Sequence, residues 1–295
     1  METQVDLIGS RLGQLVLNGS VEEIQDADRK SNIAFNINED SKRDLIQEMM
    51  VEYKYDKSPR APSGHIRYIL CMDIEATCHA DLPFLQDTHE VIELPVILVD
   101  VYEGRTIDEF HTFVKPTRDR ILSSYCQTLT GIRQDQIDSA PSFAEAVKLL
   151  DAFMLKHQDK LKPLPNAETE MLDKWRFSEP RNYVWVSHGR ADIEHFFCRR
   201  SCRINRIRLP DYLQGQYIDL KCFYQTSLKI RSGLRLIDML SSLRLQFEGR
   251  EHSGIDDARN VARIMVMLVH RYNSVLQCNR SIVMDRRLIY TARSL

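Results

Sequence analysis

Three strand-like segments follow one another between residues 68 and 114, before any strongly amphipathic helix begins. Residues 68–72 form a continuous apolar run, residues 91–101 form a second, and residues 109–114 alternate between polar and apolar positions before Pro116. Successive strands joined by short connections are typical of an antiparallel meander. This order restricts the chain to folds that contain a substantial β-sheet.

The downstream chain alternates helical and strand-like patterns. Residues 143–157 and 192–202 have helical periodicity, and residues 183–186 and 217–220 are strand-like. Apolar residues at spacings of three and four also form two stripes between Ala258 and Val269, so we expect a final helix that is buried on two sides. A meander followed by alternating helices and strands predicts an α/β fold, a mixed sheet with helices on both faces.

Composition excludes several classes of protein. The 295 residues include 40 Lys plus Arg and 42 Asp plus Glu, a net charge of −2, with 43% hydrophobic residues. This balance excludes a uniformly basic polyanion binder, an acidic disordered tail and a low-complexity fibre. The longest uncharged apolar runs, residues 94–99 and 264–269, are far shorter than the roughly 20 residues of a membrane helix, so no membrane association is expected.

The cysteines and the first residues bear on the compartment. Seven cysteines are dispersed along the chain, and residues 1–10 carry two acids without an apolar core. An odd number of scattered cysteines is typical of a reducing compartment, and the N-terminus does not resemble a secretory signal. We therefore expect a cytoplasmic protein that is also compatible with the nucleus or nucleolus.

A domain boundary is expected near residues 57–65, where two prolines and a glycine interrupt any helix. The first 64 residues carry a net charge of −4 and the rest carry +2. We predict a flexible N-terminus (1–17), a helical segment (18–56), a linker (57–65), the main domain (66–271) and a C-terminal tail (272–295). Within the helical segment, residues 21–29 and 41–55 are the predicted helices.

Acidic residues occur at three places where strands end or helices begin. Asp73 and Glu75 follow the first apolar run and, at positions i and i+2, project from the same face. Asp192 begins a helix after a strand. The third place is the start of the final helix, where Asp256 or Asp257 follows His252. Individually these are explained by solvated strand ends, helix capping and a surface loop, but together they would meet at one edge of the sheet.

Four converging carboxylates and a histidine are suited to phosphodiester hydrolysis. Mg²⁺ and similar hard cations prefer carboxylate oxygens, and two ions can clamp the attacking and leaving oxygens of a phosphodiester. In this interpretation Asp73 contacts both ions, Glu75 and the helix aspartate complete one, and Asp192 holds the other. His252 takes a proton from the attacking water, since its ordinary pKa lies near neutrality.

Asp73-x-Glu75, Asp192 and His252-x4-Asp257 resemble the three motifs of the DEDDh 3′-to-5′ exonucleases. Longer matching words make the chain similar to the enhancer-of-RNA-interference exonucleases, also called 3′ histone mRNA exonucleases, across roughly residues 66–271. These words are Asp-Ile-Glu-Ala-Thr-Cys from Asp73, His-Glu-Val-Ile-Glu-Leu-Pro from His89, Leu-Thr-Gly-Ile from Leu129, and His-Ser-Gly-Ile-Asp-Asp-Ala-Arg-Asn from His252.

The resemblance implies an RNase H-like fold with a mixed five-stranded sheet, preceded by a degenerate SAP-like helical segment at residues 18–56. It also implies two Mg²⁺ or Mn²⁺ ions per active site and assigns the helix ligand to Asp257. The implied substrate contacts are Ala76, Thr77, Leu129, Thr130, Gly131 and His252. A turn before a helix would suit Thr130 and Gly131 equally well. Family members often carry Trp where Ala191 stands here.

The implied activity is removal of nucleoside 5′-monophosphates from RNA 3′ ends. Implied substrates are small duplex or stem-loop RNAs, namely small interfering RNA, 5.8S ribosomal RNA or histone mRNA, with a role in negative regulation of RNA interference and with RNA-silencing or ribosomal partners. A DNA 3′–5′ exonuclease of the same fold and a catalytically silent RNA-binding adaptor are the alternatives. The intact five-residue set argues against the adaptor.

Positive charge is concentrated between residues 199 and 244, which carry a net charge of +7. A solvated helix face is the simple explanation, but next to a phosphodiester site a track for the RNA backbone is the better interpretation. The candidate track residues are Arg199, Arg200, Arg203, Arg206 and, in the N-terminal segment, Lys42 and Arg43.

Overall fold

The computed structural model describes residues 66–83, 89–162, 181–230 and 235–282. The predicted N-terminal helices, the SAP-like segment and the linker therefore lie outside the described residues. Within these ranges no helix is both long enough and apolar enough to cross a bilayer.

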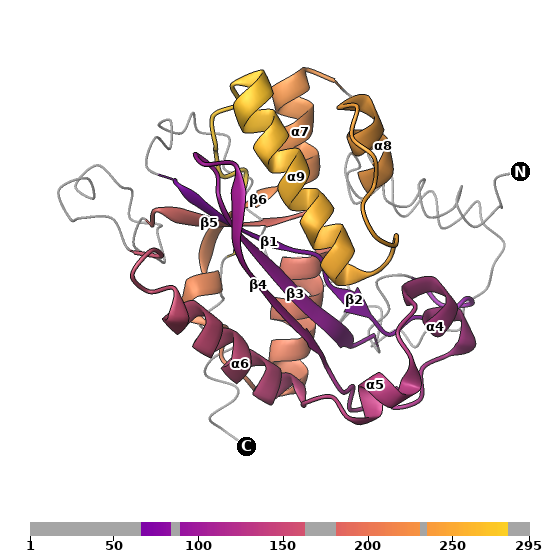
Figure 1. The fold of residues 1–295 in the computed structure, drawn as a ribbon. Helices are drawn as coiled ribbons and strands as arrows, with labels where there is room; N and C mark the ends of the chain where they lie inside the picture. The colour runs from indigo at the N-terminus through magenta and orange to yellow at the C-terminus, as the bar shows by residue number, and fades with distance from the viewer. Residues whose placement is uncertain (1–65, 84–88, 163–180, 231–234, 283–295) are drawn as a thin grey trace, which may run out of the picture. The chain divides into compact units, whose positions relative to one another are not determined.

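One mixed sheet of seven strands forms the centre of the described chain (Figure 1). Its strands are β1 (Tyr68–Met72), β2 (Glu75–Ala76), β3 (Val91–Asp100), β4 (Arg105–Phe113), β5 (Tyr183–Ser187), β6 (Gly215–Asp219) and β7 (Arg280–Ile282). Antiparallel β1, β3 and β4 form the predicted meander, while β5 is parallel to both β1 and β6. The α/β class and the mixed sheet are confirmed.

The sheet is larger than the expected five strands. A bend at Asp73 and Ile74 separates β1 from β2, which pairs farther along β3. Residues 280–282, expected in a C-terminal tail, form β7 and pair antiparallel with β6. The sequence does not indicate these two strands because each is only two or three residues long. They join the sheet through backbone pairing and leave little hydrophobic pattern.

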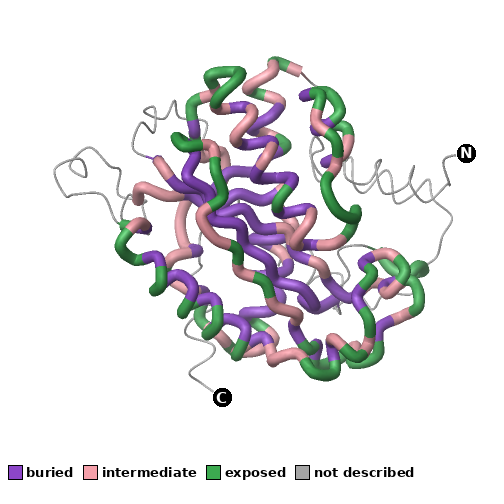
Figure 2. The backbone as a smooth tube through the Cα atoms, in the orientation of Figure 1, coloured by how far each residue is buried: buried purple, intermediate pink, exposed green. Residues whose placement is uncertain are grey.

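Helices cover both faces of the sheet. They are α4 (Ser124–Thr130), α5 (Gln134–Asp138), α6 (Phe143–Lys156), the π-helical η2 (Ala191–Cys202), the short η3 (Asp211–Leu213), α7 (Leu220–Leu228), α8 (Leu236–Ser242) and α9 (Gly254–Tyr272). Of these, α4 and α5 form a separate small cluster with Ile92 of β3. Because side chains alternate along β1, Leu70 and Met72 pack with α6 and η2, whereas Ile69 and Cys71 pack with α7, α8 and α9. Figure 2 shows the resulting buried centre.

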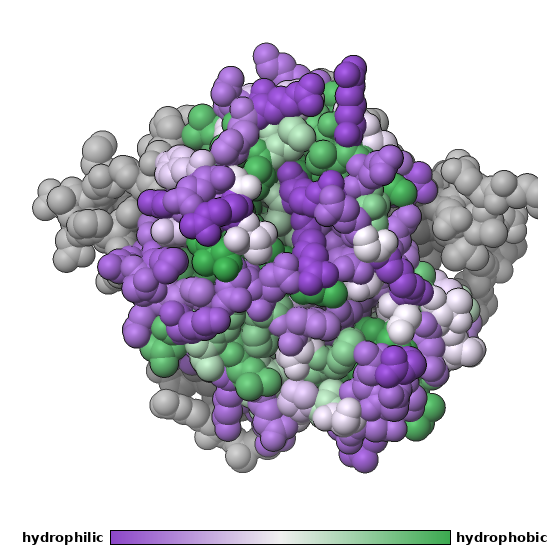
Figure 3. Space-filling view, viewed as in Figure 1, coloured by the Kyte–Doolittle hydropathy of each residue, from purple (hydrophilic) through white to green (hydrophobic). Residues whose placement is uncertain are grey.

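The sheet edge at β4 is polar. Its side chains range from exposed to half-buried and include Arg105, Asp108 and Glu109, and charged residues on an edge strand oppose pairing with another chain. On the face viewed in Figure 3, hydrophobic residues lie in small groups between hydrophilic ones. At the Val91 end of β3, β2 pairs with the strand and Glu93 contacts the start of α9.

Candidate active site

The end of β1 supplies the first two acids of the site. Asp73 and Glu75 lie on either side of buried Ile74, at the bend between β1 and β2. Glu75 pairs with Glu93 across the β2–β3 ladder, so its position is set by the strongly buried strand β3. Asp73 and Glu75 therefore lie where β1 passes into β2, beside β3.

The other acids come from the starts of two helices. Asp192 is buried in the first turn of η2, directly after β5, and its Oδ1 accepts a hydrogen bond from the Ile74 amide at 3.2 Å. Asp257 is buried in the first turn of α9. Parallel pairing of β1 with β5 brings η2 to the same edge as Asp73.

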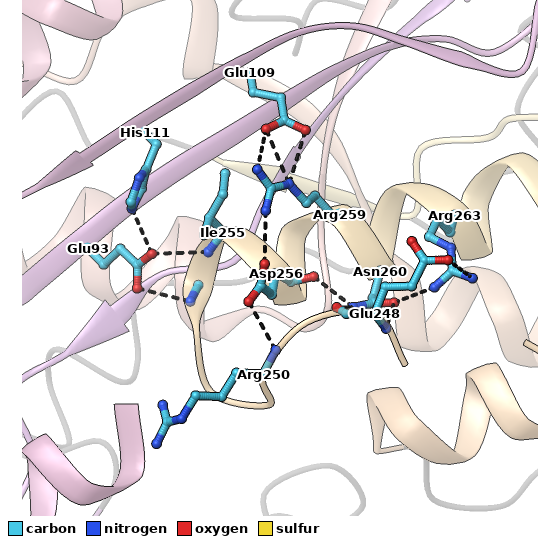
Figure 4. Close-up of polar contacts among 11 residues, drawn as sticks. Glu93, Glu109, His111, Glu248, Arg250, Ile255, Asp256, Arg259, Asn260 and Arg263 are labelled. Atoms are coloured by element: carbon cyan, nitrogen blue, oxygen red, sulfur yellow. Dashed lines mark hydrogen bonds and ion pairs between the residues drawn. The ribbon is translucent and has the colours of Figure 1, made fainter. Parts of the chain in front are cut away.

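The loop before α9 carries His252, which is exposed and has a left-handed backbone with φ of 61°. Its backbone amide donates a hydrogen bond to the Asp257 carboxylate. Asp256, in contrast, accepts hydrogen bonds from the Arg250 amide at 3.0 Å and the Arg259 guanidinium at 2.9 Å (Figure 4). The adjacent aspartates therefore point to different surroundings, and Asp257 faces the acidic cluster.

These five residues come together in space. Ligand atoms of Glu75, His252 and Asp257 all lie within 4.8 Å of one another. Asp73 interacts electrostatically with Asp192, Asp257 and Glu75, and each of these three neighbours raises its pKa. The site thus joins a strand end, two helix starts and one exposed loop.

Burial and the closeness of the carboxylates raise the pKa values of the four acids. Burial first, and then repulsion from neighbouring carboxylates, raises the pKa of Asp73 and of Glu75 well above the usual range. Burial also raises the pKa of Asp192 to about 6 and that of Asp257 to about 7. Like charges held this closely favour protonation or binding of a cation.

A lysine that the sequence reasoning did not select lies beside the acids. Lys221, exposed at the start of α7, lowers the pKa of Asp73 and Asp192 by electrostatic attraction. Its backbone amide bonds the His188 carbonyl at 3.3 Å, so α7 starts next to the segment that leads into η2. A lone lysine after a short strand gives no sequence pattern that would identify it.

Glu93 was also missed, although the sequence contains a signal for it. It is the one acid in the apolar run of residues 91–99 and is only 2% exposed. Its carboxylate accepts hydrogen bonds from His111 and from the first turn of α9 (Figure 4). A charge inside a continuous strand requires a buried partner, but the sequence does not reveal that this partner is the helix carrying Asp257.

The expected substrate contacts differ in burial and in hydrogen bonding. Ala76 is buried, and the Thr77 hydroxyl is buried and accepts a hydrogen bond from the Glu90 amide at 3.0 Å. Half-buried Leu129 and buried Thr130 end α4, and Gly131 follows with a left-handed φ of 74°. Thr130 bonds the Cys126 carbonyl, so its hydroxyl stabilises the helix end.

Arg250 connects the α4 end with the His252 loop. Its guanidinium donates to the Thr128 carbonyl at 2.7 Å, and a Cβ at Gly131 would stand 2.5 Å from the same guanidinium. Leu129–Gly131 and His252 are therefore held together by contacts between α4 and the loop that precedes α9.

Only some residues of the predicted basic track are exposed. Arg203 and Arg206 are exposed and Arg199 is half-buried, whereas Arg200 is 4% exposed and donates to His195 at 3.1 Å. Arg200 therefore does not belong on an exposed track, because the inward face of η2 carries it into the interior. Lys42 and Arg43 lie outside the described residues.

The family model described as Exonuclease (RNase_T) matches residues 70–162, a range that includes Asp73, Glu75 and strands β2 to β4. The chain is 33% identical over 274 residues to the 3′-5′ exonuclease eri1 of Schizosaccharomyces pombe, covering 88% of this chain and 90% of that protein. The chain therefore belongs to the eri1 family of 3′–5′ exonucleases and is a nuclease.

Other relatives agree with this membership. The 3′-5′ exoribonuclease 1 of Rattus norvegicus is 31% identical over 214 residues, covering 72% of this chain but only 56% of the rat protein, about half its length. The nuclease domain of 3′hExo, a DEDDh family member bound to rAMP, aligns with a TM-score of 0.63 at 30% identity, covering 75% of this chain and all of that one. A structure of histone mRNA stem-loop recognition by 3′-exonuclease aligns with a TM-score of 0.62 at 29% identity, covering 74% of this chain and 88% of that one.

Proposed function

We propose that this chain is a metal-dependent 3′–5′ exoribonuclease that removes nucleoside 5′-monophosphates from RNA 3′ ends. The observation that carries the proposal is the convergence of Asp73, Glu75, Asp192, Asp257 and His252 at one edge of the sheet. The exoribonuclease name of the rat relative and the rAMP bound to 3′hExo favour RNA as the substrate.

The donor set fits divalent cations. Carboxylate oxygens are the ligands that Mg²⁺ and Mn²⁺ prefer, and burial together with repulsion between the neighbouring carboxylates raises the pKa of Asp73 and of Glu75. Asp73, Glu75, Asp192 and Asp257 would hold the two ions through their carboxylate oxygens. When bound, the ions supply positive charge that offsets the charge developing on the phosphodiester.

His252 is the proposed general base. It is exposed, so RNA and water can reach it, and its ring nitrogen lies within 4.8 Å of ligand oxygens of Glu75 and Asp257. A positioned histidine can accept a proton from the attacking water. The hydrogen bond from its amide to Asp257 holds the loop against α9.

We further propose small duplex or stem-loop RNA as the substrate class, including histone mRNA, 5.8S ribosomal RNA or small interfering RNA ends. The stem-loop recognised by the related 3′-exonuclease supports this choice. All seven cysteines lie within the described residues as free thiols, which agrees with a reducing cytoplasmic, nuclear or nucleolar compartment. Exposed Arg203 and Arg206 remain candidates for contacts with the RNA backbone.

The test uses 5′-labelled RNA stem-loops and DNA of matching sequence, incubated with Mg²⁺, Mn²⁺ or chelator. We expect stepwise shortening of RNA from the 3′ end with either metal, slower degradation of DNA and no reaction with chelator. Loss of one metal ligand should reduce the rate by about 100-fold or more. Degradation that persists in chelator would contradict the proposal.

A matched pair of variants tests the assignment on α9. Asp257→Asn removes the proposed ligand, whereas Asp256→Asn changes the neighbouring residue, whose carboxylate bonds Arg250 and Arg259. We expect a severe loss of hydrolysis only for Asp257→Asn. Equal losses in the two variants, with both folded, would contradict the assignment of Asp257.

A further inference from the structure

Helix α9 begins without a cap from its own sequence. Ser253 occupies the capping position, but its side chain makes no capping hydrogen bond. The first amides of a helix need an acceptor from elsewhere. Glu93 of β3 supplies it, because its carboxylate accepts hydrogen bonds from Gly254 at 3.0 Å and from Ile255 at 3.1 Å.

Glu93 is itself held in place on the sheet. It is 2% exposed, and its Oε1 lies 2.8 Å from Nε2 of His111 on the adjacent strand β4. Figure 4 shows the carboxylate between the His111 ring and the first turn of α9. The carboxylate thus connects two strands with the start of a helix that is more than 160 positions away in the chain.

The same carboxylate lies beside the proposed metal ligands. Glu93 pairs with Glu75 across the β2–β3 ladder, and its negative charge contributes to the raised pKa values of Glu75 and Asp257. A capping residue chosen only for helix stability would avoid this repulsion, and Ser, Thr, Asn or Asp next to α9 would serve that purpose. The position of Glu93 instead connects the strand that aligns Glu75 with the helix that carries Asp257.

Close packing at Gly254 limits how this turn can move. A Cβ at Gly254 would stand 3.2 Å from the Glu93 carboxyl group and 2.7 Å from the backbone oxygen of Asp73. The first turn of α9 is therefore confined between Glu93 and the end of β1.

We propose that Glu93, supported by His111, is a positioning residue that aligns the first turn of α9 with β1 and β2. It thereby brings Asp257 and His252 into the arrangement with Asp73 and Glu75 that binds metal and attacks RNA. This inference rests on the proposed function, because Glu93 would position the proposed metal ligands without being one of them.

The experiment compares Glu93→Gln with Glu109→Gln. Glutamine has the size of glutamate but a single acceptor oxygen, whereas Glu93 uses Oε2 for Gly254 and Oε1 for Ile255 and His111. Glu109 pairs with Arg259 on the exposed side of the same helix at 2.6 Å, so its variant removes a contact to α9 away from the acids. Both variants leave the proposed ligands intact.

Three quantities are measured, namely Mn²⁺ affinity of the metal-free protein by calorimetry, amide hydrogen exchange of residues 253–258, and kcat with KM for RNA. For Glu93→Gln we expect about tenfold weaker Mn²⁺ binding and about tenfold lower kcat, with KM within about twofold, the scale typical for residues that orient metal ligands. Amide exchange at Gly254 and Ile255 should accelerate, while Glu109→Gln should leave all three quantities within about twofold.

The inference is overturned if folded Glu93→Gln matches Glu109→Gln in Mn²⁺ affinity and amide exchange. If Glu93→Gln does not fold, His111→Gln removes only the support of the carboxylate and is measured in the same way. It should show smaller changes in the same direction, and unchanged values would overturn the inference. A wild-type protein that neither binds Mn²⁺ nor hydrolyses RNA would instead contradict the proposed function.

Discussion

A Cβ atom added at Gly254 would stand 2.7 Å from the backbone carbonyl oxygen of Asp73, closer than packed atoms allow. The start of α9 therefore lies directly against the end of β1. This contact brings Asp257 to the acids that follow β1, because Asp257 lies one helical turn after Gly254. The geometry of the site depends on the absence of a side chain at residue 254.

Gly254→Ala should therefore impair the site and lower stability. Overpacking of this kind costs about 1–3 kcal/mol, and we expect the Tm to fall by about 2–10 °C. A displacement of the first turn should also reduce RNA hydrolysis by about tenfold or more. Gly189→Ala is the control, since its nearest neighbour would be the Lys221 side chain at 3.8 Å. Equal Tm and activity in the two variants would contradict the close contact.

Asp257→Asn should stabilise the metal-free protein at alkaline pH. Burial raises the pKa of Asp257 to about 7 in the folded state, whereas an unfolded aspartate has a pKa of about 4. Between these values the folded protein binds more protons than the unfolded chain, so the free energy of unfolding falls as pH rises from about 4 to 7. Asparagine does not ionise, so the variant does not lose stability in this way as the pH rises.

The measurement is the Tm of both proteins in chelator between pH 5 and pH 8. The Asn variant should melt about 2–4 °C above wild type at pH 8, and the difference should shrink towards pH 5. Mg²⁺ should raise the Tm of wild type more than that of the variant, because ligand binding stabilises the folded state. Parallel curves across this range would show that ionisation of Asp257 does not lower the stability of the folded protein.

Arg250→Ala should slow hydrolysis by releasing the His252 loop from α4. The hydrogen bond from Arg250 to the Thr128 carbonyl is 2.7 Å long, and losing such a bond corresponds to a decrease in kcat of about 3- to 10-fold. Arg133→Ala is the control, since this exposed arginine lies just before α5 and pairs with Asp135 in that helix. An effect confined to KM would indicate that Arg250 contacts RNA and does not position His252.

The sheet and the final helix could be predicted from the sequence because their residues bury continuous or periodic apolar surfaces. The meander and α9 follow from such patterns. Strand β7 could not be predicted, since its three residues join the sheet through backbone pairing with β6. The sequence predicts Arg200 in a basic track because it belongs to a run of arginines near the predicted phosphodiester site, and only the packing of η2 shows that it is buried.

The acids of the site could be selected because strand ends and helix starts gather at one edge of a mixed sheet. Asp73 and Glu75 share a face through their spacing of two. The part played by Glu93 depends on a contact with Gly254 across 161 positions, and no local pattern encodes such a contact. Lys221 was missed for the same reason, since its proximity to Asp73 arises from the order of strands β1, β5 and β6.

We propose that Asp73 and its neighbours hydrolyse the last phosphodiester of RNA. The test uses RNA that carries ³²P only in the phosphate between its last two nucleotides, incubated with Mg²⁺. We predict that wild type releases the label first as a nucleoside 5′-monophosphate, and that Asp73→Asn releases it at least about 100-fold more slowly. Label that stays in the shortened RNA, appears as a 3′-monophosphate, or leaves equally fast with Asp73→Asn would contradict the claim.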